Sequence, residues 1–112
     1  MTKQAPPIPL TFPLQLLNDQ LVTVLSGAIN YWGSITERDG DLTWKGTWTI
    51  AEYADEEEAI ATHTLDRDAL QRGLQVMLEK YPRTFSDLLT GGDRHTADLL
   101  VQLAIFGEEK YA

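Results

Sequence analysis

The sequence contains no cysteine and only two histidines among its 112 residues. The absence of cysteine excludes disulfide bonds, thiolate zinc sites and a cysteine nucleophile, and it suits a protein that works in a reducing cytoplasm. No apolar run reaches the roughly 18 residues that a membrane-spanning helix requires. The amino-terminal residues also lack the apolar core of a signal peptide. We therefore expect a cytoplasmic protein that has no membrane partner.

Basic residues are scarce as well, since nine lysines and arginines stand against 17 aspartates and glutamates, for a net charge of −8. An acidic surface repels phosphate, so we expect no direct binding of nucleic acid. Net acidity keeps many proteins soluble, and it also suits a protein that binds a basic partner. The hydrophobic content of 43% is ordinary for a folded chain, and the length predicts a single domain at residues 10–112.

Motifs of enzymes and nucleotide-binding proteins are missing too. There is no phosphate-binding glycine loop and no nucleophilic serine between glycines. His63, His95 and Asp98 have the side chains of a two-histidine, one-carboxylate metal site, but no pattern places His63 near the other two. His95 and Asp98 serve equally well as capping residues of a helix. We therefore lean towards a protein that is not an enzyme, without cofactor or metal ion; a hydrolase that uses Asp98 and His95 is a weaker alternative.

The amino-terminal part predicts an arm, a strand and a helix. Three prolines in residues 1–9 predict an extended arm. Leu10 to Leu16 alternate between apolar and other residues, which is typical of a strand, and Pro13 places that strand at an edge. Asn18 is the predicted N-cap of the helix, whose apolar residues keep helical spacing up to an end near Gly27 to Asn30.

The middle of the chain predicts three antiparallel strands, which cover residues 31–36, 42–54 and 59–65. Asp39-Gly40 is the turn signal between the first two strands, and Asp55 to Glu58 form an acidic turn between the last two. In the second strand Gly46 lies between two tryptophans, Trp44 and Trp48, on one face. It leaves a gap there for a neighbouring side chain or a ligand.

Three helices are predicted to follow the strands. The first begins at the N-cap Asp66 and stops before Pro82, and Gly73 inside it suits a place where another element packs very close. A short amphipathic helix is closed by Gly91-Gly92. The last helix runs from about residue 93 to about residue 108, and it is apolar almost all round, which indicates burial on most sides. The expected fold is α+β, with an N-terminal strand and helix, a three-stranded antiparallel meander, and three helices packed on one face of the sheet.

The last helix also contains the main candidates for a binding site. Asp98 and Gln102 are four residues apart and share a face. A buried carboxylate needs a partner, so Asp98 is either a cap or hydrogen-bonded to a strand, or it is the polar floor of a pocket. The aromatic residues either pack in the core or stack a flat ring such as a base. In the second case the phosphate contact is expected from Arg67, Arg72, Arg83 or Arg94, and no pattern says which of them lies close. The predicted ligand-binding residues are Tyr31, Trp32, Trp48, His95, Thr96, Asp98 and Gln102.

Four segments together resemble a family of small proteins encoded by tailed bacteriophages. They are GAINYW at Gly27 to Trp32, HTL at His63 to Leu65, TAD at Thr96 to Asp98, and AIFGEEKY at Ala104 to Tyr111. The resemblance runs in this order from about residue 18 to the C-terminus. Ala112 departs from it, since the family has a glycine after the tyrosine.

This resemblance implies a phage accessory or counter-defence protein that acts in the cytoplasm of the host cell. One hypothesis is a binding module that sequesters a small nucleotide-like signal molecule in an aromatic-lined pocket. The alternative is an acidic interaction inhibitor, of the DNA-mimic or anti-CRISPR type, that blocks a basic host protein. We expect a homodimer in either case, because exposed aromatic residues and the arm are natural dimer contacts.

Overall fold

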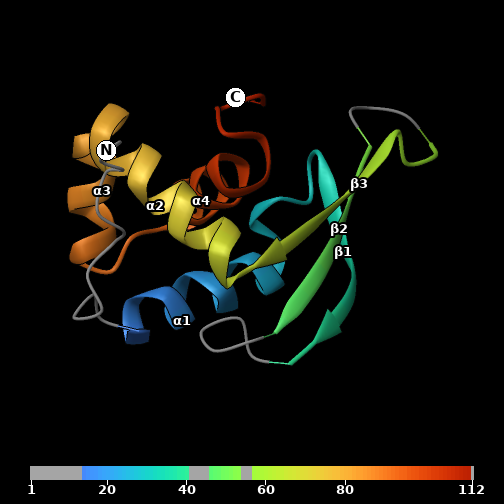
Figure 1. The fold of residues 1–112 in the computed structure, drawn as a ribbon, viewed down its shortest axis with the longest axis horizontal. Coiled ribbons are helices and arrows are strands. Elements are labelled where there is room, and N and C mark those ends of the chain that lie inside the picture. The colour runs from blue at the N-terminus through green and yellow to red at the C-terminus, as the bar shows by residue number, and fades with distance from the viewer. Residues whose placement is uncertain (1–13, 41–45, 54–56, 112) are drawn as a thin grey trace, which may run out of the picture.

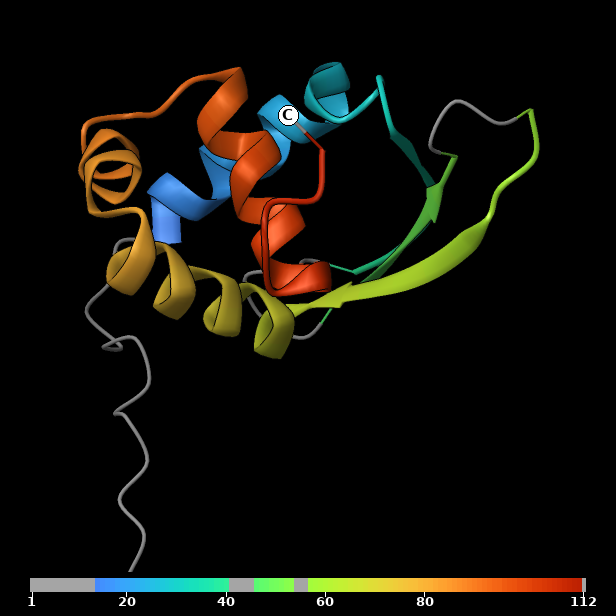
Figure 2. The same ribbon diagram turned by 90° about the horizontal axis from the view of Figure 1, so that it is seen from above.

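The computed structural model describes residues 14–40, 46–53 and 57–111. Its elements are α1 (Leu14–Thr23), the π-helical turn η1 (Val24–Ala28), β1 (Gly33–Asp39), β2 (Thr47–Glu52), β3 (Ala61–Asp66), α2 (Arg67–Lys80), α3 (Pro82–Leu89) and α4 (Arg94–Phe106) (Figure 1). The predicted α+β class and three-stranded antiparallel meander are confirmed. The helices lie to one side of the curved sheet, with α4 and η1 on its concave side (Figure 2).

Strand β2 is the centre of the sheet, between β1 and β3. Its residues Trp48, Ile50 and Glu52 are buried, whereas the threonines between Gly46 and Ile50 are exposed or half-buried. This alternation is that of a strand with one face on the core, as predicted. Residues 42–45 of the predicted strand lie outside the described residues.

Strand β1 contains an irregularity that the sequence did not predict. Ile35 pairs with Ile50, but Glu37 pairs with the next residue, Thr49, so one extra residue is accommodated at Thr36. Such a β-bulge re-aims the side chains that follow it. Arg38 then lies opposite Trp48, on the same inner face as Ile35, although three residues separate Ile35 from Arg38.

The first helix begins earlier than predicted. Leu14 to Leu16 belong to α1, and Asn18 lies inside the helix and is not its N-cap. Short apolar runs fit strand and helix alike, and here the spacing of Leu14, Leu17 and Leu21 suits a helix better. The arm at residues 1–9 and the first part of the predicted strand lie outside the described residues. The helix end is confirmed, because η1 ends at Ala28 and its last turn contains Gly27 with φ 108°.

The capping residues of the later helices explain where they begin. Asp66 caps α2 as predicted, with its carboxylate accepting a hydrogen bond from the backbone of Ala69 at 2.8 Å. Asp93 caps α4 in the same way, accepting from the backbone of Thr96 at 3.0 Å. His95 and Asp98 are therefore not the caps of α4, because Asp93 already occupies that position.

Helix α4 lies at the centre of the core. All nine residues from Thr96 to Ala104 are buried, as the apolar pattern predicted. The predicted close approach at Gly73 is also confirmed, because a Cβ there would lie 2.8 Å from the backbone nitrogen of Ala104. None of the described helices combines the length and apolar character needed to cross a membrane.

Candidate functional site

The structure brings four of the seven predicted site residues together around the carboxylate of Asp98. One oxygen, Oδ1, accepts hydrogen bonds from Trp32 Nε1 at 2.8 Å and from Gln102 Nε2 at 3.0 Å. The other oxygen accepts from the hydroxyl of Tyr31. Both carboxylate oxygens therefore have protein donors, as a buried carboxylate requires.

Gln102 also holds the last residues of the chain. Its Oε1 accepts hydrogen bonds from the backbone nitrogens of Lys110 and Tyr111, both at 2.8 Å. Its Nε2 donates to the backbone oxygen of Tyr111 at 2.9 Å. The Tyr111 ring stacks on Trp32, with a centroid separation of 5.4 Å and an interplanar angle of 6°. The C-terminal segment thus covers the site around Asp98.

A second buried carboxylate, Glu52, holds the same segment from the sheet. It is 1% exposed, and it accepts hydrogen bonds from Lys110 Nζ at 2.6 Å, from His63 Nε2 at 2.8 Å and from the Tyr111 hydroxyl. The sequence did not single it out, because a glutamate at the end of a strand pattern is ordinarily exposed. We call Tyr31, Trp32, Glu52, Asp98 and Gln102 the C-terminal clamp.

The pKa values within the clamp indicate fixed charges and not proton transfer. Burial would raise the pKa of Glu52, but the hydrogen bonds from Lys110, Tyr111 and His63 outweigh it and lower the pKa to about 2. Burial raises the pKa of Tyr31 strongly, and the hydrogen bond and charge of Asp98 raise it further. A general acid or base needs a pKa near the working pH, and both shifts go the other way. The clamp is therefore best understood as a means of fixing the C-terminal segment.

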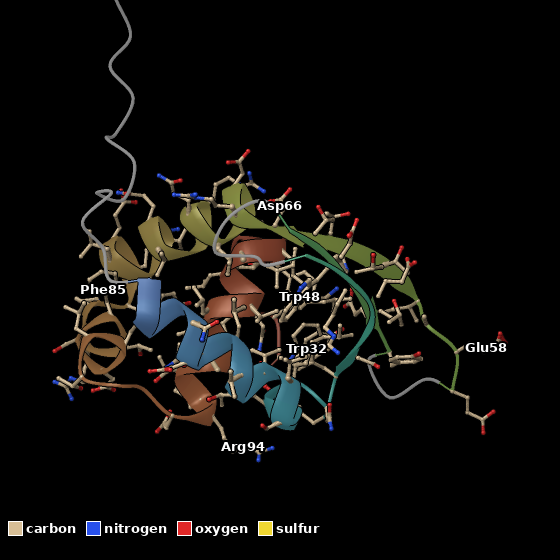
Figure 3. The ribbon with its side chains drawn as sticks, turned by 90° about the horizontal axis from the view of Figure 1, so that it is seen from below. Trp32, Trp48, Glu58, Asp66, Phe85 and Arg94 are labelled. Atoms are coloured by element: carbon tan, nitrogen blue, oxygen red, sulfur yellow. The ribbon has the colours of Figure 1, made fainter. Side chains whose placement is uncertain are left out.

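The other predicted site residues have separate surroundings. Trp48 is 6% exposed, on the inner face of β2, and its Nε1 donates to the backbone oxygen of Gly40 at 3.3 Å. Figure 3 shows Trp32 and Trp48 in the interior between the sheet and the helices. His95 is exposed in the first turn of α4, and the Thr96 hydroxyl donates to Asp93 at 3.1 Å. In the described part of the chain no three His, Asp or Glu residues form a group that could hold a metal ion.

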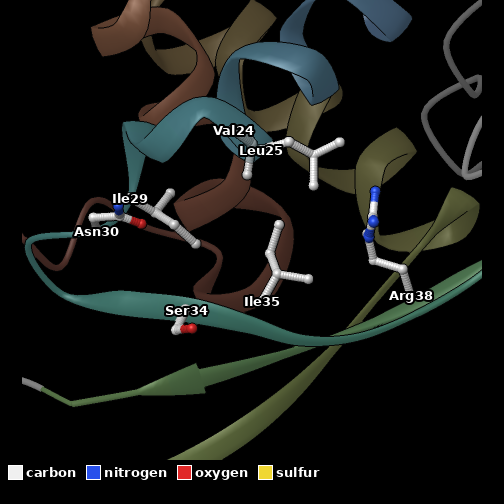
Figure 4. A pocket seen from close by; sticks show the side chains of 7 residues that line it. All are labelled: Val24, Leu25, Ile29, Asn30, Ser34, Ile35 and Arg38. Carbon is white, nitrogen blue, oxygen red and sulfur yellow. The ribbon is translucent and has the colours of Figure 1, made fainter.

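A cavity of about 320 Å³ lies elsewhere, between η1 and β1 (Figure 4). We call it the η1–β1 cavity, and its lining residues are Val24, Leu25, Ile29, Asn30, Ser34, Ile35 and Arg38. Asn30 and Arg38 lie towards opposite ends in Figure 4, with Ile29 and Ile35 between them. None of these residues belongs to the predicted ligand-binding set.

Two backbone irregularities form this cavity. Gly27 has φ 108°, a conformation that favours glycine, and it allows η1 to end and turn back towards β1. Hydrogen bonds from Trp32 and Gly33 to the oxygen of Ile29 complete the turn. On the other side, the bulge at Thr36 points both Ile35 and Arg38 towards η1. β-Bulges are frequent next to functional sites.

Arg38 supplies the charge of the η1–β1 cavity. Its neighbours Glu37 and Asp39 pair with Thr49 and Thr47, so they lie on the other face of the sheet. Within the part of the chain that the structure describes, Arg38 forms no ion pair or hydrogen bond. An unpaired guanidinium beside apolar walls can bind a carboxylate or phosphate through two parallel hydrogen bonds. Arg38 is not among the arginines expected from the sequence as phosphate contacts, because only the bulge places it on the inner face of the sheet.

Comparison of the chain with protein-family models, with curated proteins and with solved structures finds no match. A functional assignment therefore depends on the geometry of the η1–β1 cavity and the C-terminal clamp.

Proposed function

We propose that the protein is a non-enzymatic binding module that holds a small, nucleotide-like anion in the η1–β1 cavity. The observation that carries this proposal is Arg38, an unpaired cation that lines a cavity of about 320 Å³ in a protein of net charge −8. That volume lies within the range of ligand sites, which is roughly 300–1,000 Å³. The remaining lining includes the amide of Asn30 and the hydroxyl of Ser34, and polar atoms make up most of the surface that faces the cavity, which suits a polar ligand.

The proposed ligand lies in this cavity and not against the predicted aromatic residues. Trp32 and Trp48 are 1% and 6% exposed, so their ring faces contact protein. Tyr31 is 52% exposed, but its hydroxyl is bound by Asp98. The polar atoms of Asp98 and Gln102 are likewise engaged with the chain itself. A ligand there would have to displace the C-terminal segment.

The resemblance to small phage proteins suggests where such binding is useful. A protein that only sequesters a nucleotide-like signal needs an affinity for it but no catalytic group. We therefore propose a counter-defence protein that removes a small host signal by binding it.

The experiment is a thermal-shift and fluorescence screen against mono-, di- and cyclic nucleotides. A ligand at 100 times its Kd stabilises the folded state by about 2.7 kcal/mol, which raises the melting temperature. Trp48 lies opposite Arg38, so we also expect its fluorescence to change on binding. Arg38→Gln should abolish both responses, whereas Arg72→Gln, at an exposed position on α2, should retain them. If no nucleotide changes either signal, the proposal is wrong.

A second candidate function is favoured by the tip of the β2–β3 connection. Glu57 and Glu58 are exposed there, and Figure 3 places Glu58 at the far end of the molecule from the helices. Ile60 beside them is 52% exposed. An acidic, partly apolar protrusion suits contact with a basic protein surface, in an interaction that salt weakens. Salt-sensitive capture of a host protein that Glu57→Lys with Glu58→Lys abolishes would support this alternative, and unchanged capture would count against it.

A further inference from the structure

Among the described residues that line it, the η1–β1 cavity has one cation, Arg38, and the other guanidinium nearby, that of Arg94, donates a hydrogen bond to the backbone oxygen of Gly27. The flanking Glu37 and Asp39 face away. A second phosphate would lie without a partner in a molecule whose overall charge of −8 repels it. The charges therefore match a ligand with one anionic group.

The size and the walls of the cavity limit the rest of the ligand. About 320 Å³ is at the small end of the range for ligand sites, which favours a body of about one ring system. Ile29 and Ile35 lie between the polar ends, and Leu25 contributes a further apolar wall. Asn30, towards the end away from Arg38, offers both a hydrogen-bond donor and an acceptor.

From this arrangement we infer that the ligand is a ring compound with a single phosphate or carboxylate at one end and a hydrogen-bonding edge at the other. The anion pairs with Arg38, the ring lies against Leu25 and Ile35, and the polar edge meets Asn30. A nucleoside monophosphate has this chemistry, and so does an aromatic carboxylate with a polar substituent. A dinucleotide with two phosphates does not. This inference rests on the proposed function, because it specifies the ligand class of the same cavity.

The test is isothermal titration calorimetry of the full chain with four probes: adenosine monophosphate, adenosine, cyclic di-adenosine monophosphate and nicotinate. We expect adenosine monophosphate or nicotinate to bind, which distinguishes a phosphate from a carboxylate as the anion. Adenosine should bind at least 10-fold more weakly than adenosine monophosphate. Arg38→Gln should weaken binding of the anion on the order of 10- to 100-fold, because hydrogen bonds to charged groups are strong. Arg72→Gln is the matched control and should leave the affinity unchanged.

A second variant keeps the test independent of Arg38. Leu25 is 44% exposed on η1, so Leu25→Trp should fill the cavity without disturbing the core and should abolish binding of every probe. The inference is overturned if cyclic di-adenosine monophosphate binds most tightly, or if adenosine binds as well as its monophosphate and Arg38→Gln has no effect. In the first case, if Arg38→Gln also weakens binding, the cavity still binds a nucleotide and the proposed function stands; in the second case Arg38 binds no anion, and the proposed function fails with the inference. If no probe binds the unmodified protein, the inference and the proposed function fail together.

Discussion

The C-terminal clamp and the η1–β1 cavity both place charged side chains beside the core, but those of the clamp carboxylates are buried and that of Arg38 is exposed. In the clamp both carboxylates have their oxygens bound by donors of the same chain. In the cavity the guanidinium of Arg38 has no partner among the described residues. A fully paired buried network stabilises one conformation, whereas an unpaired group beside a cavity is available to a ligand. The two regions thus differ in whether their charged groups already have hydrogen-bond partners in the chain, and this difference says more about their roles than the residue types do.

The largest loss of stability is expected when the carboxylate of Glu52 is removed from the C-terminal clamp. Glu52→Ala removes the acceptor of hydrogen bonds from Lys110, His63 and the Tyr111 hydroxyl, and three hydrogen bonds to a charged group at roughly 1.5 kcal/mol each suggest a loss of about 3–5 kcal/mol. The partly exposed lysine favours the lower end of that range. Urea denaturation measures the loss, and Glu57→Ala, at an exposed glutamate, should change stability by less than about 0.5 kcal/mol. A loss below about 1 kcal/mol would mean that Glu52 does not hold the C-terminal segment.

The stability that Glu52 contributes should also depend on pH. Its pKa falls from 4.5 to about 2 on folding, so the folded state favours the ionised form. The contribution is therefore fully present above pH 4.5 and is lost as the pH falls towards 2, and it amounts to about 3 kcal/mol. Urea denaturation from pH 6 down to pH 2 should show the difference between the unmodified protein and Glu52→Ala shrinking across that window. If the difference in stability between the two proteins stays constant down to pH 2, Glu52 does not stabilise the fold through its ionised form.

A smaller loss of stability is expected when the carboxylate of Asp98 is replaced. Asp98→Asn keeps the shape of the side chain but replaces an accepting oxygen with a donor and removes the charge. We expect a loss of about 2 kcal/mol, typical of hydrogen bonds to a charged group. The pKa of Tyr31 should move back towards its ordinary value, because Asp98 no longer raises it. Alkaline titration of tyrosinate absorbance measures this, with the exposed Asp87→Asn as control; an unchanged Tyr31 titration would contradict the proposed contact.

The smallest effect on stability is predicted for the cavity. Arg38 is exposed and unpaired among the described residues, so Arg38→Gln should change the free energy of unfolding by less than about 0.5 kcal/mol. The same variant should lose ligand binding. Arg38→Gln should therefore lower the affinity for the ligand without lowering stability, whereas the substitutions in the clamp should lower stability. If Arg38→Gln destabilised the protein as strongly as Asp98→Asn, Arg38 would be part of the fold and not a group reserved for a ligand.

Much of the fold could be predicted from local patterns. Alternation around Ile50, the N-cap at Asp66 and the stop before Pro82 each depend on residues close together in the sequence, and the structure contains all three. The start of α1 was predicted wrongly. The apolar residues in a run as short as residues 10–16 fit the spacing of a strand and that of a helix equally well. The site was predicted less well. Asp98 and Gln102 share a helix face, which spacing reveals, but their partners lie 66 residues or more away or at the chain end.

The sequence alone determined the α+β class, the order of the three strands and three later helices, the burial of α4, and the position of Asp98 and Gln102 on one face of that helix. These follow from periodicity, caps and charge, which act over a few residues. Only the tertiary structure decided what those groups do. Folding brings Glu52 and Asp98 to the same C-terminal segment, and a one-residue bulge turns Arg38 towards η1. Neither event has a local signal, because each depends on which strand or helix lies opposite.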